Sequence, residues 1–529
     1  MSQTRPLGAQ ISHMLKDRGV DVIFGIPGVH NQEMYRGIEE AGITHVLARH
    51  EQGAGFMADG YARATGKPGV AYVITGPGLT NIMTPMGQAY SDSVPMLVIS
   101  SCLDETAATK GQLHQMKDQR AAAETVCDWS EEARSAQAAY ALINRAFMEF
   151  HTARCRPKHI QVPIAQLEAV ASPHDPADMG LCDGVEQMEP ALFPVLPQMI
   201  KEARKPLLIL GGGARDGHDD LRRLLARCPI PVFTTYAGRG IVAPEYPYLF
   251  GSTLARPDSA AIVAEADLVI VIGTELAEVD LWRAHLGDTQ RMVRIDVDPA
   301  VLAASGRNAT RFKAAAHTVF RGLDAAADLP TSFDWTPAQI AATRDRWRAE
   351  IDAERPGIVP VCDALRACLP EGTMIYSDMT QFAYTAKEVW DMDAPGHWHH
   401  PTGFGTLGYA TPAAIGGAVA RKGLPTMAII GDYGFHYTMA ELGVAVELGL
   451  PLPIFLWDNG KLKEIEDSMV RAQIAPNAVV ARNPDFCKLA EAFGAYSAAP
   501  RTLAAMQGAV RAAFEADGPT LIHVTPDIV

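Results

Sequence analysis

An acidic residue and an amide residue each follow an apolar segment in the C-terminal part of the chain. Asp432 comes after Met427–Ile430, and Asn459, 27 residues further on, comes after Leu452–Trp457. We predict that both apolar segments are buried strands, which places the two side chains at the edge where open α/β sheets bind ligands. A carboxylate and a carboxamide oxygen held together there suit a hard cation that carries a diphosphate. The alternative is that both polar segments are simple turns.

A second acidic residue, Glu51, lies near the N-terminus between a strand-like run, Ile43–Leu47, and a segment rich in small residues. We expect it to be buried where the strand passes into a helix. A buried carboxylate without a partner is costly, so Glu51 needs either a partner or a raised pKa. The alternative is an acidic residue in a first helical turn, stabilised by the helix dipole.

Length and composition limit the possible classes of protein. A chain of 529 residues is too long for one core, and about 150 residues per domain gives about three domains. The net charge of −15 argues against a nucleic-acid or anionic-membrane partner. There is no apolar run of 18 residues and no apolar signal core at the N-terminus. Eight scattered cysteines without a Cys-x-x-Cys pair favour reduced thiols in the cytoplasm.

The elements that would position these residues form three α/β blocks, each predicted to be a doubly wound parallel sheet. The blocks span residues 1–175, 190–330 and 340–529, with polar, Pro-containing connectors between them. The predicted strands are Asp21–Gly25, Val70–Thr75, Met96–Ser100, His159–Val162, Pro206–Leu210, Val232–Tyr236, Leu268–Gly273, Met292–Val297, Met374–Ser377, Met427–Ile430, Pro453–Trp457 and Thr520–Val524. The middle block is expected to be Rossmann-like.

A glycine run in the middle block, Gly211-Gly212-Gly213, suggests a dinucleotide site. The G-x-G-x-x-G pattern would require glycine at position 216, where the chain has Asp216. A tight strand-to-helix turn is therefore favoured over a nicotinamide-dependent enzyme.

The C-terminal motif resembles the metal–diphosphate motif of thiamin diphosphate enzymes, in which Gly-Asp-Gly is followed by Asn-Asn. The chain departs from it at Tyr433 and Asp458, while both ligand positions are intact. The resemblance implies that Mg²⁺ is bound by Asp432, Asn459 and the carbonyl of Lys461, with two diphosphate oxygens and a water. It also implies that the amides of Gly434 and Phe435 face the phosphate, and that Thr380 and Gln381 contact the diphosphate.

The segment His50-Glu51-Gln52-Gly53-Ala54 resembles the His-Glu-x-x-Ala segment of the same family. The resemblance implies that Glu51 holds the pyrimidine N1′ and favours the imino tautomer, which takes the thiazolium C2 proton and yields the ylid. The segment 403–416 resembles that of acetolactate synthase, in which the carbonyl of Gly405 would accept the 4′-amino hydrogen. Leu407, where methionine is usual, would wedge beneath the cofactor and bend it.

Three further residues are candidates for contact with the substrate. His30 stands at a position like that of the active-site histidine in benzaldehyde lyase, and Gln115 resembles the active-site glutamine of acetolactate synthase. His114 resembles the histidine that some decarboxylases use for proton transfer, and a pKa near 6.5 suits protonation of an enamine. Satisfied loop histidines and a solvated polar loop are the alternatives.

The resemblance covers essentially the whole chain and points to the acetolactate synthase and 2-oxo acid decarboxylase branch. It implies decarboxylation of a 2-oxo acid to an aldehyde through the ylid and an enamine. Segments around Gln115 and Asp432 are similar to 5-guanidino-2-oxopentanoate decarboxylase, and Glu464 or Asp118 would face the guanidinium group. The alternative for these residues is an acidic first helical turn that the helix dipole stabilises. A carboligase that joins two carbonyl substrates is the alternative, and binding of FAD stays open. A non-catalytic relative is disfavoured because Glu51 is present.

The resemblance also implies a homo-oligomer. The cofactor would lie between block one of one subunit and block three of another, so a dimer is the smallest active unit and a homotetramer is common. The expected partner is otherwise a small-molecule 2-oxo acid, with no nucleic acid and no membrane.

Overall fold

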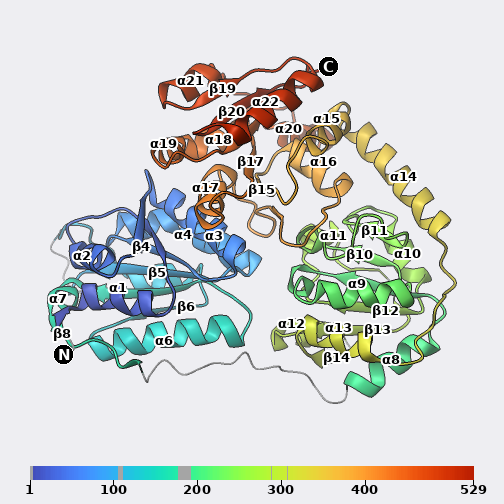
Figure 1. Ribbon diagram of the computed structural model, residues 1–529, viewed down its shortest axis with the longest axis horizontal. Helices are drawn as coiled ribbons and strands as arrows, with labels where there is room; N and C mark the ends of the chain where they lie inside the picture. The colour runs from blue at the N-terminus through green and yellow to red at the C-terminus, as the bar shows by residue number, and fades with distance from the viewer. Residues whose placement is uncertain (1–3, 105–110, 177–191, 288, 307) are drawn as a thin grey trace. The chain divides into compact units, whose positions relative to one another are not determined.

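The computed structural model describes residues 4–104, 111–176, 192–287, 289–306 and 308–529. This part of the chain forms three six-stranded sheets and one two-stranded sheet (Figure 1). It divides into two compact units, one made of residues 1–184, 375–380 and 403–529 and the other of 185–374 and 381–402. The predicted class, three parallel-sheet α/β blocks, is confirmed. The block boundaries stay predictions, and residue 190 lies outside the described residues.

The first sheet has the strand order β3-β2-β4-β5-β7-β6, and all its neighbouring strands are parallel. Helices α1, α2, α6 and α7 contribute to the core on one face of it, and α3 and α4 lie on the other face (Figure 1). The strands are β2 Val22–Gly25, β3 Thr44–Leu47, β4 Gly69–Val73, β5 Met96–Cys102, β6 Trp129–Glu132 and β7 Lys158–Pro163. The helices are α1 Leu7–Asp17, α2 Gln32–Glu40, α3 Glu51–Thr65, α4 Pro77–Asp92, α5 Gln119–Glu124, α6 Ala136–Thr152 and α7 Ile164–Glu168. The two-stranded sheet pairs β1 (Arg5–Pro6) with β8 (Val170–Ala171).

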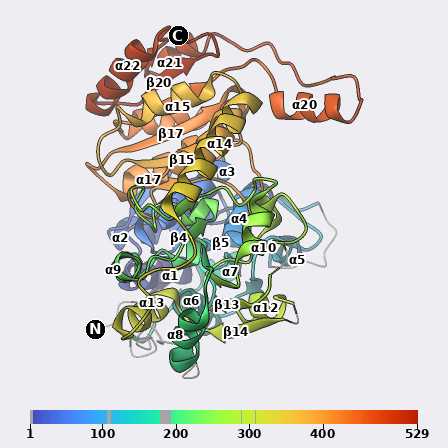
Figure 2. The same ribbon diagram turned by 90° about the vertical axis from the view of Figure 1, so that its right-hand side faces the viewer.

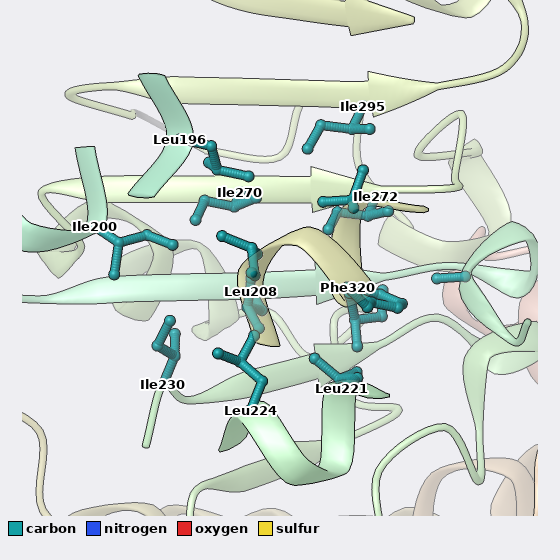
Figure 3. Close-up of a cluster of buried hydrophobic side chains, with 14 of the residues drawn as sticks. Leu196, Ile200, Leu208, Leu221, Leu224, Ile230, Ile270, Ile272, Ile295 and Phe320 are labelled. Carbon is teal, nitrogen blue, oxygen red and sulfur yellow. The ribbon is translucent and has the colours of Figure 1, made fainter. Parts of the chain in front are cut away.

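The second sheet has the order β11-β10-β9-β12-β13-β14, and its pairs are also parallel. Its strands are β9 Pro206–Leu210, β10 Val232–Thr234, β11 Leu249–Gly251, β12 Leu268–Ile272, β13 Met292–Asp296 and β14 Ala309–Lys313. Figure 3 shows apolar side chains of three strands packed against those of α8 (Leu192–Glu202), α9 (His218–Arg227) and α13 (Ala316–Ala325). The other helices of this unit are α10 Ser259–Glu265, α11 Glu278–Leu281, α12 Pro299–Ala303, α14 Pro337–Glu354, α15 Ile358–Arg366 and α16 Gln381–Val389.

The glycine run of the middle block is a packing feature. A Cβ on Gly211 would lie 2.2 Å from the carbonyl oxygen of Gly273, and one on Gly213 would lie 3.2 Å from the Gly273 Cα. A short 3-10 turn, Gly212–Ala214, follows β9 directly. The loops after β9 and β12 therefore need small residues to approach each other, and the favoured interpretation as a tight turn is confirmed.

The third sheet has the order β16-β15-β17-β18-β20-β19. Its strands are β15 Met374–Ser377, β16 Trp398–His399, β17 Thr426–Gly431, β18 Pro453–Trp457, β19 Tyr496–Ala498 and β20 Thr520–Val524. Its helices are α17 Ala410–Ala420, α18 Asp432–Thr438, α19 Leu442–Glu447, α20 Lys463–Arg471, α21 Phe486–Ala492 and α22 Leu503–Glu515. Among the described residues of the whole chain, none of the helices combines the length and the apolar character that crossing a membrane requires.

Candidate active site

Glu51 is the first residue of α3, and a short connection joins it to the end of β3 at Leu47. Its side chain is 8% exposed, and its Oε2 accepts a hydrogen bond from Asn81 Nδ2 at 2.8 Å. A Cβ on Gly78 would lie 3.4 Å from Glu51 Oε1, so the start of α4 packs against the carboxylate. The buried acid expected from the sequence therefore has its partner, Asn81, on the neighbouring helix.

His30 and His114 lie together at the same sheet edge. Their ring centroids are 4.9 Å apart at an interplanar angle of 70°. His30 follows β2, and the carbonyl oxygen of His114 lies 2.5 Å from where a Cβ of Gly76, just beyond β4, would stand. Neither buried Nδ1 atom has a hydrogen-bond partner among the described residues. Burial lowers the pKa of His30, and His114 lowers it further, so His30 is neutral at pH 7.

Gln115 lies in the polar segment that joins His114 to α5. Its Oε1 accepts a hydrogen bond from the amide of Gln112 at 3.2 Å. In the same segment, Asp118 caps α5, because its carboxylate accepts a hydrogen bond from the amide of Ala121 at 2.9 Å. Asp118 thus has a structural use that the sequence analysis did not assign to it.

Asp432 and Asn459 follow neighbouring strands, since β17 and β18 are parallel and Gly431 is paired in register with Trp457. Asp432 is 3% exposed and begins α18. Burial raises its pKa, and the charge of Asp458 adds to that rise. The Oδ1 of Asn459 accepts a hydrogen bond from the amide of Lys461 at 3.3 Å. The two side chains therefore share one edge of the third sheet.

Asn483 is a residue that the sequence analysis missed. Its Nδ2 donates to Asp432 Oδ2 at 2.7 Å and to Asp458 Oδ1 at 2.9 Å. Asp458 also contacts His523 Nε2 at 2.8 Å and accepts from the amide of Gly460 at 3.0 Å. Burial alone would raise the pKa of Asp458, but these partners hold it below its usual value. Asp458, which stands where the family motif has asparagine, therefore belongs to a hydrogen-bond network that orients the side chain of Asp432.

Asp378, directly after β15, is a second missed residue. Its buried carboxylate accepts from the amide of Gly408 at 2.9 Å and from that of Ala410 at 3.3 Å. Burial raises its pKa to about 7. A Cβ on Gly434 would lie 2.9 Å from Asp378 Oδ2, so the starts of α17 and α18 meet at this carboxylate. An aspartate directly after a buried strand was the available signal.

The other predicted cofactor contacts lie at the start of α16, before α17 and in α18. Thr380 Oγ1 lies 3.1 Å from where a Cβ of Gly431 would stand, and Gln381 begins α16. Gly405 has a φ of +68°, in the left-handed region that favours glycine, and Leu407 beyond it is half-buried. The Phe435 side chain is fully buried and packs on Phe486, with centroids 5.8 Å apart, so only its backbone is available for a phosphate.

Glu441 is a third missed residue, and it joins the two halves of this unit. The buried carboxylate accepts from the amide of His50 at 2.9 Å and from that of Arg49 at 3.1 and 3.2 Å. A Cβ on Gly53 would lie 2.2 Å from Glu441 Oε1, so Gly53 makes room for the carboxylate. Burial raises the pKa of Glu441 to about 7. Glu441 therefore fixes the backbone directly before Glu51.

The donor groups fit the expected cofactor. Asp432 and Asn459 supply hard oxygen ligands of the kind that Mg²⁺ binds together with phosphate oxygens. The turn around Gly431 and Gly434 leaves little room for a side chain, and the first amides of α18 are of the kind that bind phosphate oxygens. Glu51 supplies a buried carboxylate for a ring nitrogen.

Comparison with known proteins identifies the family. Three family models of thiamine pyrophosphate enzymes match the chain: the N-terminal binding domain over residues 5–122, the central domain over 196–323 and the C-terminal binding domain over 378–524. A probable 2-ketoarginine decarboxylase of Pseudomonas aeruginosa is 40% identical over 99% of this chain and 94% of its own length. The acetolactate synthase isozyme 2 large subunit of Escherichia coli is 29% identical over 98% of this chain and 95% of its own length. The chain therefore belongs to the thiamine pyrophosphate-dependent enzymes.

Proposed function

We propose that the protein is a Mg²⁺-dependent decarboxylase of 5-guanidino-2-oxopentanoate, which is 2-ketoarginine, or of a similar basic 2-oxo acid. The products are CO₂ and the aldehyde that is one carbon shorter. The observation that carries this proposal is the 40% identity to a probable 2-ketoarginine decarboxylase along nearly the full length of both chains. The His30–His114 pair favours an aldehyde over a carboligation product, because it can supply a proton to the product carbon after CO₂ has left.

Residues at the edge of the third sheet would bind the metal and the diphosphate, and residues at the edge of the first sheet would bind the pyrimidine ring. Thiamin diphosphate, when bound, supplies the nucleophilic carbon and the electron sink for decarboxylation. Asp432, Asn459 and the Lys461 carbonyl would hold Mg²⁺ and with it the diphosphate. Glu51 would hold a proton at the pyrimidine N1′, and Asn81 keeps its carboxylate in place through the 2.8 Å hydrogen bond.

The remaining predicted residues would orient the cofactor and the substrate. Thr380, Gln381 and the amides of Gly434 and Phe435 would contact the diphosphate. Gly405 and Leu407 would contact the part of thiamin diphosphate that carries its two rings. His114 would deliver a proton to the product carbon, and the neutral His30 and Gln115 would position the substrate carboxylate and keto group.

The guanidinium group of the substrate needs an acidic partner. We propose Glu464 as the residue that contacts it, because Glu464 lies half-buried in the first turn of α20, shortly after the segment 459–461 that would hold Mg²⁺. Asp118, the other acidic candidate from the sequence, caps α5.

We further propose that the active unit is a homodimer or a homotetramer with shared sites. None of the residues of α20 is buried, and Figure 2 shows this helix standing away from the third sheet. Ile465, Val470 and Ile474 are 49%, 58% and 52% exposed, an apolar surface that a second copy would cover. The seven described cysteines are free thiols, which supports the proposal of a cytoplasmic location, and Cys182 lies outside the described residues.

A panel of 2-oxo acids tests the proposed reaction. With thiamin diphosphate and Mg²⁺, 5-guanidino-2-oxopentanoate should release CO₂ and give an aldehyde of matching mass, while the uncharged 2-oxohexanoate reacts with a much higher KM. Glu464→Gln should raise the KM for the guanidino substrate about 10-fold or more and leave that for 2-oxohexanoate unchanged. Formation of acetolactate from pyruvate, with no reaction of the guanidino acid, would favour the carboligase alternative instead.

A further inference from the structure

A cluster of buried cationic and donor groups in the second unit has no role in the proposed reaction. Arg239 follows β10 and is 4% exposed. Its Nε donates to the carbonyl oxygen of Tyr236 at 3.1 Å, and its Nη1 and Nη2 atoms have no hydrogen-bond partner among the described residues. An unpaired guanidinium at this depth is costly, because both its charge and its donors have left water.

Two neighbouring side chains present further donors at the same place. The hydroxyl of Tyr236, which is 3% exposed, has no partner within the described part of the chain. Lys387, 5% exposed, holds its ammonium 3.9 Å above the centre of the Tyr236 ring. The Arg239 guanidinium stacks on Trp398 at 4.4 Å, which fixes its plane. Stacking orients the guanidinium but satisfies none of its donors.

Three carboxylates act on the cluster through their charge: Glu388 and Asp280 on Lys387, and Asp391 on Arg239. Asp280 accepts a hydrogen bond from the amide of Tyr236 at 3.3 Å, Glu388 lies 3.6 Å from Arg256, and Asp391 is hydrogen-bonded to Arg344. Burial lowers the pKa of Arg239 to about 9 and that of Lys387 to about 8, so both groups still carry positive charge at pH 7. Among the described residues, none of these carboxylates accepts a hydrogen bond from Arg239 Nη1 or Nη2 or from the Tyr236 hydroxyl.

We propose that Arg239, Tyr236 and Lys387 form a binding site for one small oxyanion, a phosphate or a carboxylate. The two free guanidinium nitrogens form a fork that suits two oxygens of one such group, and the Tyr236 hydroxyl and the Lys387 ammonium supply additional donors. This site lies in the second unit, on the segment after β10 and on α16, and it is independent of the proposed reaction.

Equilibrium dialysis of the enzyme loaded with thiamin diphosphate and Mg²⁺ tests the proposal, since the loaded cofactor occupies the other phosphate-binding positions. Labelled phosphate and labelled acetate are the two probes, run to equilibrium in a buffer free of other oxyanions. We expect one bound oxyanion per chain in the wild type and none in Arg239→Met. Arg204→Gln, which alters a surface arginine of the same unit, should bind as the wild type does. The probe that binds more tightly identifies the source.

Thermal unfolding supplies a second readout. Without oxyanions, Arg239→Met should be at least as stable as the wild type, because it removes an unpaired buried charge. Saturating phosphate or acetate should raise the wild-type Tm by about 2 °C or more and leave that of Arg239→Met unchanged. If Arg239→Met does not fold, Tyr236→Phe should weaken binding about 5- to 10-fold. Absence of binding to the wild type, which would mean that the donors face only internal water, or equal binding to Arg239→Met, would overturn the proposal.

Discussion

Glu441 illustrates how a buried carboxylate outside the reacting groups controls the placement of a catalytic residue. It receives three hydrogen-bond contacts from the amides of Arg49 and His50, so the start of α3 is attached to the segment that follows α18. Glu441 is 1% exposed, so bulk water does not reach these amides in the folded protein. The sequence offered only a polar residue within an apolar helical stretch, and its partner 391 residues away was not visible in it.

Glu441→Ala should therefore affect both stability and cofactor binding. The two amides lose their acceptor, at a cost of about 1 to 3 kcal/mol for each unsatisfied group. Glu51 then loses its fixed position, so the Kd for thiamin diphosphate should rise and kcat should fall even well below the unfolding temperature. Fluorescence titration with the cofactor and steady-state kinetics measure the two effects. Glu441→Gln keeps one acceptor oxygen, so its Kd and kcat should lie between those of the wild type and those of Glu441→Ala. If Glu441→Ala had the same Kd and kcat as the wild type, the positioning role would be refuted.

His159 makes the stability of the first sheet sensitive to acid. It is fully buried on β7, 2.8 Å from Ser100 Oγ and 2.7 Å from Ser130 Oγ. Burial lowers its pKa from 6.5 to about 3. Below pH 6.5 the unfolded chain takes up a proton that the folded chain refuses, so the contribution of His159 is complete above pH 6.5 and is lost as the pH falls toward 3.

Urea unfolding at several pH values measures this effect. Between pH 6 and pH 4 the free energy of unfolding should fall by about 1.4 kcal/mol per pH unit more in the wild type than in His159→Gln. Both proteins share all other titrating groups, so the difference in slope reports on His159. Equal slopes would show that His159 takes up a proton in the folded state.

At the scale of elements, the close contact of α3 with α17 aligns the two sheet edges of the first unit (Figure 1). A Cβ on Gly60 would lie 1.9 Å from the carbonyl oxygen of Ala413, and one on Gly416 would lie 1.9 Å from that of Met57. Tyr409, just before α17, donates its hydroxyl to Asp59 at 2.7 Å. These glycines allow the helix backbones to touch, so α3 presents Glu51 from a rigid support.

Gly60→Ala tests this contact. The added methyl group meets backbone, which cannot move aside cheaply, so the free energy of unfolding should fall by about 1 to 3 kcal/mol. Gly508 in α22 is the matched control, since a Cβ there has no heavy atom within 4 Å. Gly508→Ala should leave stability unchanged or raise it by up to about 1 kcal/mol. Urea unfolding of both variants measures these changes. If Gly60→Ala and Gly508→Ala changed the free energy of unfolding equally, the close contact between α3 and α17 would not be what limits the side chain at Gly60.

The central strands could be predicted from the sequence, and several edge strands could not. β9, β12, β17 and β18 are uniformly buried and appear in the sequence as continuous apolar runs. Edge strands such as β14 and β19 expose one side, and their mixed residues resemble loops. Tyr236, predicted as the end of a strand, lies instead in a 3-10 turn after β10, a correction of two residues.

The candidate site shows the same division. Asp432, Asn459 and Glu51 could be predicted because each lies at or shortly after the end of a strand and matches a family motif. Asn81, Asp378, Glu441 and Asn483 act through contacts with residues distant in the sequence, and no spacing rule predicts such contacts. The roles of all these residues in catalysis stay proposals.

At the scale of the whole molecule, the matches to the N-terminal, central and C-terminal family models account for all three sheets. We propose that Glu51 and Asp432 serve one cofactor from different subunits. In a symmetric dimer with isologous contacts, each site then takes Glu51 from one chain and Asp432 from the other. A hetero-dimer of Glu51→Ala with Asp432→Ala would contain one site with both residues intact and one with neither.

Co-expression of these two variants with different affinity tags, followed by tandem purification, yields hetero-oligomers of proven composition. Each variant alone should be inactive in CO₂ release with thiamin diphosphate and Mg²⁺. The hetero-oligomer should recover about half of the wild-type turnover per chain, because one of its two sites is complete. Inactive hetero-oligomers that still bind the cofactor would contradict the shared site.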